Sequence, residues 1–265
     1  MPVEAVPYKN PEPLPAPSLS ADTTPNEQDT PQPAPPAAQP PPGGNTFAGF
    51  LDFNVYPYLA NDKSDSIFSI NMLAILPRGF SYFGFVNFNG DPKRNPFMDS
   101  GGFYSEHTLN YTFWDKLPID ALIQYNPRTG PANDRFRVGV RLRVDAVPYL
   151  GDLLKKIYVS YGVNFHFYQL DHQTDRYVTQ IEQFGRMDFP YLDNRLYISA
   201  FGDRTFNEGL QKALGLRRKN PLVSEIQAGV RLYDQLYFIY EFRILEYRAA
   251  DVLNHAIGGE YVAKW

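Results

Sequence analysis

Two side chains in the first half of the sequence, Ser105 and His107, have the types and the spacing that nucleophilic chemistry could use. A serine hydroxyl attacks an ester when a histidine takes its proton and a third group orients that histidine. Residues two apart share one face of a β-strand, so the pair could serve a membrane lipid hydrolase. The sequence offers no obvious carboxylate or amide partner on that face, and such a pair arises readily by chance. We therefore predict no catalytic residue and no enzyme activity.

A larger set of residues could bind a flat, polar solute without any chemistry. Aromatic faces among amide and charged groups suit a nucleobase or a sugar ring. The predicted substrate-binding residues are Phe83, Phe85, Asn87, Tyr158, Asn164, Tyr168, Arg137, Arg141, Glu241 and Arg243. The arginines are also compatible with a structural ion-pair ladder, and the two phenylalanines with simply filling an interior.

A metal site is not predicted. His166 shares its strand face with no second histidine, so we expect a hydrogen-bonded interior residue rather than a metal ligand. No cofactor is predicted either.

Strands must position these residues, and the clearest strand is Lys156 to Tyr168. Its odd positions are all apolar or aromatic, and its even positions are small, polar or amphipathic. A period of two over such a length favours a strand that crosses the roughly 25 Å apolar band of an outer membrane. Charged residues of both signs on the polar faces of neighbouring strands can pair across the ladder.

The same alternation recurs along the chain from Phe47 to the end. The predicted strands are 47–59, 66–76, 79–90, 103–114, 117–126, 134–147, 155–168, 177–189, 192–203, 221–233, 235–248 and 253–265. Alternate connections are tight, as at Pro77-Arg78, and those between them are mostly longer and rich in Asp, Asn, Gly and Pro. The fold class is therefore an all-β, antiparallel, up-and-down transmembrane β-barrel of about 12 strands. We expect it in a bacterial outer membrane, with both termini periplasmic.

The polar faces argue against a water-soluble barrel or sandwich. A solvent-facing surface should be rich in Lys and Glu with few rings, but these faces carry Tyr158, Tyr168, Phe83 and a row of arginines. Aromatic residues make up 15% of the chain, which suits the girdles of a membrane barrel. Cysteine is absent, which fits a chain exported through an oxidising periplasm.

Residues 1–45 form a separate, proline-rich arm that is expected to be disordered, and residues 46–265 form the barrel. The arm carries Lys9 and five acidic residues, which leaves 24 basic and 24 acidic residues in the barrel. A neutral barrel lacks the basic excess that binds nucleic acid, so we expect no nucleic-acid partner. The arm is either a spacer or a docking segment for a periplasmic or envelope protein. No basic and apolar signal sequence follows Met1.

Three stretches of the barrel region are distinctive: the aromatic run Phe80 to Phe88 with the following Asn89-Gly90-Asp91, the turn Phe113 to Leu117, and the strand pair from Glu225 to Tyr247. In these stretches the barrel region resembles the nucleoside-specific outer-membrane channels, the Tsx-like family. The resemblance spans Phe47 to Trp265 in pattern and order, while the proline-rich leader departs from the family. The resemblance implies a twelve-stranded channel that uses interior aromatic and polar residues, here Phe83 and Phe85, for nucleosides.

Two functions therefore remain open besides the lipid hydrolase. The first is passive diffusion of small polar solutes, with nucleosides as candidates, through an aromatic- and charge-lined lumen. The second is a structural barrel that anchors an arm-bound envelope partner. Outer-membrane lipids are expected partners in every case.

Overall fold

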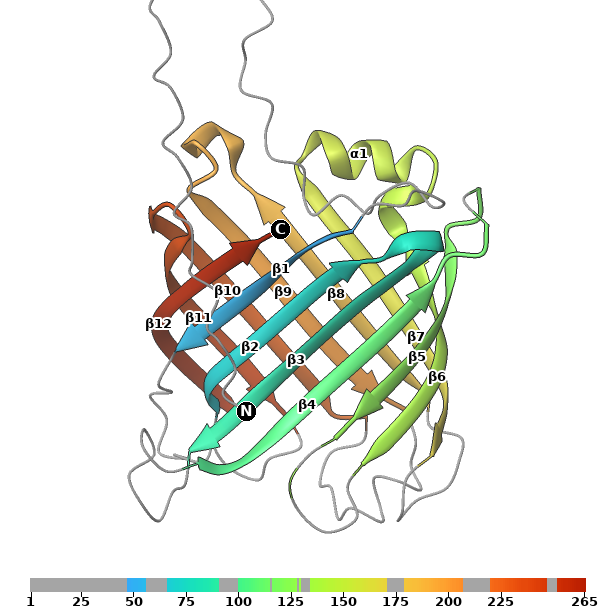
Figure 1. The fold of residues 1–265 in the computed structure, drawn as a ribbon, viewed down its shortest axis with the longest axis horizontal. Coiled ribbons are helices and arrows are strands. Elements are labelled where there is room, and N and C mark those ends of the chain that lie inside the picture. Colours follow the sequence, from blue (N-terminus) through green and yellow to red (C-terminus); the bar gives the residue numbers. More distant parts are fainter. Residues whose placement is uncertain are drawn as a thin grey trace, which may run out of the picture. The chain divides into compact units, whose positions relative to one another are not determined.

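Each of the twelve predicted strands is present in the computed structural model, and neighbouring strands pair antiparallel (Figure 1). The structure describes residues 47–55, 66–90, 100–114, 116–127, 129, 134–170, 179–206, 220–246 and 252–265. The predicted arm and most of the predicted longer loops lie outside these residues. The prediction of an up-and-down barrel of about 12 strands is confirmed.

The strand bounds follow the predicted runs within a few residues. They are β1 Ala48–Val55, β2 Ser66–Ile75, β3 Phe80–Gly90, β4 Ser100–Tyr111, β5 Ile119–Asn126, β6 Arg135–Arg143, β7 Val159–Leu170, β8 Gln180–Asp188, β9 Leu196–Thr205, β10 Leu222–Tyr233, β11 Leu236–Leu245 and β12 Leu253–Lys264.

The first and last strands close the barrel. β1 pairs with β12 over six residue pairs that run from Phe50 opposite Lys264 to Val55 opposite Gly259. Gly49 and Trp265 add two reciprocal backbone hydrogen bonds of 3.2 Å. Because the sheet is closed on itself, it presents no unpaired edge strand.

Side chains alternate between the interior and the exterior along the strands, as β5 illustrates. Asp120, Leu122 and Gln124 are almost completely buried, while the intervening Ile123 and Tyr125 are 42% and 43% exposed. The exterior of the other strands carries the same kind of residue. Exposed outward side chains include Val55, Phe165, Phe167, Ile198, Ile226, Val230, Phe238, Tyr240, Leu253, Ile257 and Tyr261.

The short connections gather at one end of the barrel, where 3₁₀ turns at Pro77–Gly79 and Pro190–Leu192 join neighbouring strands. The longer connection from β6 to β7 lies at the same end and begins with a 3₁₀ turn at Val144–Ala146. Phe47 and Trp265 stack here with ring centroids 6.1 Å apart. The two ends of the described barrel therefore meet at its short-turn end.

A short helix, α1 (Leu150–Lys156), also caps this end (Figure 1). The sequence analysis extended the seventh strand back to residue 155, but α1 occupies that position and β7 begins at Val159. Apolar residues three and four apart, Leu150, Leu153 and Leu154, favour a helical turn here. No helix among the described residues is long and apolar enough to cross a membrane.

Candidate functional site

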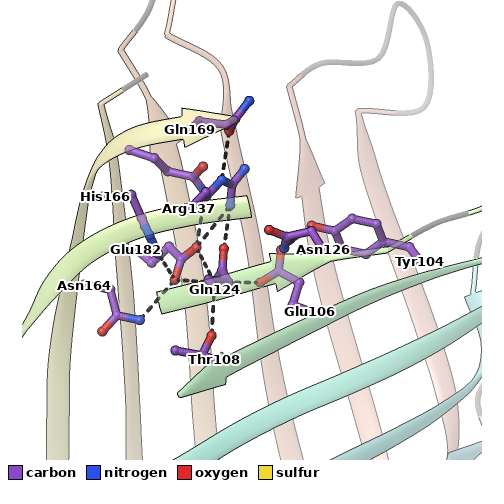
Figure 2. A network of polar contacts seen from close by, with 11 residues as sticks. Tyr104, Glu106, Thr108, Gln124, Asn126, Arg137, Asn164, His166, Gln169 and Glu182 are labelled. Atoms are coloured by element: carbon purple, nitrogen blue, oxygen red, sulfur yellow. Dashed lines mark hydrogen bonds and ion pairs between the residues drawn. The ribbon is translucent and has the colours of Figure 1, made fainter. Parts of the chain in front are cut away.

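The interior of the barrel contains a polar network centred on Glu182 of β8 (Figure 2). The Glu182 carboxylate accepts hydrogen bonds of 3.1 Å from Asn164 Nδ2 and from Gln124 Nε2. His166 Nε2 lies 3.0 Å from Oε2, and Arg137 Nη1 lies 3.5 Å from Oε1. The Glu182 side chain is only 3% exposed. Several donors therefore surround a carboxylate that would otherwise be costly to bury.

Gln124 carries this network across to β4. Its amide nitrogen lies 3.2 Å from Thr108 Oγ1 and 3.4 Å from Glu106 Oε2, and Tyr104 donates to the same glutamate. The Gln124 carbonyl accepts from Arg137 Nη1 at 2.8 Å. The network therefore links strands β4, β5, β6, β7 and β8, as Figure 2 shows.

A second interior group surrounds Asp120 of β5, which is fully buried. Arg141 Nε donates to Oδ2 at 2.9 Å, Arg143 Nε lies 3.1 Å from Oδ1, and Thr112 donates at 2.7 Å. Arg141 also reaches Ser81 of β3 at 3.4 Å, although β4 and β5 lie between the two strands. The arginine row of β6 therefore forms ion pairs, one of the two roles that the sequence left open.

On the other side of the barrel, Arg243 of β11 lies between two acids. Its Nε is 2.7 Å from Glu225 Oε1 and 3.2 Å from Glu241 Oε1. Arg243 and Glu241 are 4% and 2% exposed. These two predicted site residues therefore pair with each other inside the barrel.

The predicted aromatic residues of β3 line the interior. The Phe85 ring lies 6.4 Å from the Phe83 ring and 5.9 Å from the Tyr104 ring, and Asn87 accepts a hydrogen bond from Ser69. Phe83 is 37% exposed although it points inward. Its exposure indicates free space in the lumen beside this ring.

Tyr168 does not point inward, contrary to the prediction. A β-bulge in β7 changes the register, because Val138 pairs with Tyr168 whereas the next residue, Gly139, pairs with His166. The extra residue, Phe167, shifts the alternation by one position. Tyr168 consequently lies opposite an outward residue, and Gln169 takes the inward position, where it accepts from Arg137 at 2.9 Å.

Tyr158 is also misplaced by the sequence analysis. It precedes β7 in the turn after α1, with a left-handed φ of 57°. Its ring meets that of Tyr191 edge-on at 5.9 Å, at the short-turn end. Tyr158 therefore belongs to the rim of the barrel, and the structure does not bring it together with Phe83 or Asn164.

On the outside of the barrel, Ser105 and His107 do form a hydrogen-bonded chain. Ser105 Oγ lies 2.7 Å from His107 Nε2, and His107 Nδ1 lies 2.6 Å from the Tyr82 hydroxyl. Ser105 Oγ also donates to the Phe85 carbonyl at 2.8 Å and is 1% exposed. Tyr82 supplies the third group of this chain, in place of the carboxylate or amide that orients the histidine in the usual triads.

Asp120, Gln124 and Glu182 are buried inward residues that were not among the predicted site residues. Alternation assigns a face, and it carries no information on which inward residues meet across the lumen. The available signal in the sequence was that few acids and amides share the polar faces with several arginines, so these few are the natural partners of the arginines.

Comparisons with known proteins assign no family. No family model and no curated protein matches this chain. Solved structures similar to it include a protein from a study of in-meso crystallization of membrane proteins, at 11% identity, with 82% of this chain and 84% of the other covered and a TM-score of 0.47.

Two porins are also similar. KdgM porin has 8% identity over 81% of this chain and 98% of its own, with a TM-score of 0.45. A Rhodopseudomonas blastica porin variant has 9% identity over 82% and 99%, with a TM-score of 0.35. Because these TM-scores are all below 0.5, the barrel is described from its own strands and contacts alone.

Proposed function

We propose that this chain is an outer-membrane channel through which small polar solutes diffuse passively. The observation that carries the proposal is the division of the closed sheet into two faces. Outward side chains such as Ile123 and Phe238 are large and apolar, whereas inward ones such as Asp120 and Glu182 are charged and paired. A bilayer requires that exterior, and a water-filled passage suits that interior.

The solute proposed is nucleoside-like. The neighbouring rings of Phe83 and Phe85 offer a stacking surface, and the side chain of Asn87 lies two residues further along the same inward face. A nucleobase has a flat face for the rings and polar edges for an amide. Conduction requires only weak binding, since the solute must also leave.

The short turns support the proposed orientation, because outer-membrane barrels have their short turns on the periplasmic side. Tyr149 and Tyr191 at this end are 89% and 86% exposed, and the Phe47 and Trp265 rings stack nearby. Exposed rings suit the aromatic girdle that such barrels carry at each of their two interfaces. Both ends of the described barrel would then lie on the periplasmic side.

Single-channel recording in a planar bilayer tests this function. The purified barrel should give stable, small conductance steps that added nucleosides reduce, whereas a sugar phosphate of similar size should reduce them less. If no nucleoside changes the conductance steps, the proposed solute is wrong, but the proposal of a channel stands. A reconstituted barrel that never conducts would overturn the channel itself.

A closed, structural barrel is the second candidate, and the contacts that bridge non-adjacent strands favour it. Gln124 reaches Glu182, Arg141 reaches Ser81, and Tyr197 of β9 donates to Glu260 of β12. Such a barrel would serve as an anchor for an envelope partner of the arm. In that case deletion of residues 1–45 should abolish co-purification of the partner, and the intact barrel should not conduct.

A further inference from the structure

Two inward carboxylates lie side by side where the barrel closes. Asn54 of β1 stands directly opposite Glu260 of β12, and Asp52 lies two residues before it on the same face. Asp52 therefore lies diagonally across the strand pair from Glu260, where the two carboxyl groups interact electrostatically. The Tyr197 hydroxyl, from β9, donates to Glu260 Oε2. Four oxygen-bearing side chains from three strands therefore converge at the seam.

The charge balance at this pair differs from that at Asp120 and Glu182. Asp120 is paired with two arginines, and Glu182 with an arginine and a histidine. The described partners of Asp52 besides Glu260 are the neutral amides of Asn71, at 3.4 Å, and Asn54.

One guanidinium does influence Glu260, but it has other partners. Arg186 acts on Glu260 electrostatically. Its Nη2 lies 3.0 Å from Asp188 Oδ1, and the guanidinium carbon lies 3.8 Å above the centre of the Tyr197 ring. Arg186 therefore compensates the negative charge of Asp52 and Glu260 only in part. Two neighbouring carboxylates in this situation favour a bound cation or a shared proton.

A buried oxygen in the same cluster distinguishes these two possibilities. Asn54 is 1% exposed, and its Oδ1 atom has no hydrogen-bond partner in the structure. A buried acceptor without a donor costs about 1–3 kcal/mol. A proton shared between Asp52 and Glu260 leaves this oxygen unsatisfied, whereas a metal ion can use it as a ligand.

We propose that Asp52, Asn54 and Glu260 form a binding site for a hard divalent cation, Ca²⁺. Two carboxylates balance the charge of the ion, and carboxylate and amide oxygens are the ligands that Ca²⁺ prefers. The described residues include no group of three or more His, Cys, Asp or Glu side chains placed to hold a metal. Neutral oxygens and water therefore complete the coordination. Tyr197 orients Glu260 through its hydroxyl.

The ion joins the first strand of the barrel to the last. Asp52 and Asn54 belong to β1 and Glu260 to β12, and these strands form the seam on which closure of the barrel depends (Figure 1). An ion that binds only the folded barrel stabilises it by mass action. Ca²⁺ consequently raises the unfolding temperature, whether or not the barrel conducts.

The experiment is a Ca²⁺ titration of the purified, EDTA-treated barrel in a non-ionic detergent, followed by thermal unfolding. We expect a saturable rise in the unfolding midpoint for the wild type. Asp52→Asn and Glu260→Gln should each abolish that rise. Without Ca²⁺, each variant should unfold at the wild-type temperature or above, because the repulsion between the two carboxylates is gone. Glu225→Gln, which alters an acid paired with Arg243 elsewhere in the lumen, should keep the full rise.

Equilibrium dialysis of the wild type with radioactive Ca²⁺ gives a readout that requires no variant. Retention of one ion per barrel supports the site. An absence of retained Ca²⁺, or a midpoint shift that persists unchanged in both Asp52→Asn and Glu260→Gln, would overturn it. Because neither readout involves conduction, failure of the channel function would leave the result interpretable.

Discussion

Gln124 and Glu182 are hydrogen-bonded at 3.1 Å although β6 and β7 lie between their strands. In a flat sheet, side chains three strands apart are separated by about 14 Å. The curvature of the closed barrel brings these two together over the lumen. The contact shows that part of the lumen is occupied by side chains of the wall. In the proposed channel, the solute would therefore pass beside the network of Figure 2.

Removal of the central carboxylate should destabilise the barrel strongly. Glu182→Leu leaves Arg137 and His166 without their acid, and a broken buried ion pair costs about 3–5 kcal/mol. Urea unfolding in detergent micelles measures the loss. The double variant Arg137→Met/Glu182→Leu should recover part of it, because it removes both charges. A double variant less stable than the single would contradict the assigned pairing.

Asp120 offers a comparison between a buried ion pair and a partly exposed one. Asp120→Asn removes the charge that holds Arg141 and Arg143, and its side chain is 0% exposed, so we expect a loss of about 3 kcal/mol or more in the free energy of unfolding. The matched control is Asp188→Asn, whose partner Arg186 is 39% exposed. Exposed pairs contribute about 0–1 kcal/mol. Equal losses in the two variants would show that burial does not decide the effect.

The solute assignment predicts a role for the two rings of β3. Phe83→Ala and Phe85→Ala should each weaken nucleoside block of the channel by about fivefold or more, since stacking of a base on a ring contributes about 1–3 kcal/mol. Single-channel titration with a nucleoside measures the affinity. Phe238→Ala, which alters an outward ring, should leave block unchanged. Wild-type affinity in both inward variants would remove these rings from the site.

Glycine positions differ in how closely the neighbouring strand approaches. A Cβ atom at Gly139 would overlap the Phe165 carbonyl oxygen and lie 3.1 Å from the His166 Cα. Gly139→Ala should therefore destabilise the barrel by about 1–3 kcal/mol. At Gly202 the nearest atom to such a Cβ lies 3.6 Å away. Gly202→Ala should be neutral or stabilising, because glycine in a strand costs entropy. Chemical denaturation of both variants measures the difference in the free energy of unfolding. Equal effects of the two substitutions would contradict the close approach of β7 at Gly139.

The outward chain of Tyr82, His107 and Ser105 should be structural. Tyr82→Phe removes the partner of His107 Nδ1, so we expect a loss of about 1–2 kcal/mol in the free energy of unfolding. Ser105→Ala should change lipid hydrolysis by a purified sample no more than Tyr82→Phe does. Hydrolysis that Ser105→Ala specifically abolishes would instead establish Ser105 as a nucleophile.

The sequence by itself determined the strands and most of their faces. A period of two is a local property of the chain, so the inward positions of Phe83, Arg137, Arg141 and Glu241 could be read from their neighbours in sequence. The same holds for the strand number and for the short connections, which depend on turn residues such as Pro77 and Asp234.

Only the tertiary structure decided the partners and the exceptions. The bulge at Phe167, which turns Tyr168 outward, depends on how β7 pairs with β6. Tyr158 lies at the rim because α1 displaces the start of β7. The contact between Gln124 and Glu182, and the meeting of Asp52 with Glu260, require closure of the barrel. Closure brings together strands that are distant in the chain, and alternation along one strand carries no information about which residues then face each other.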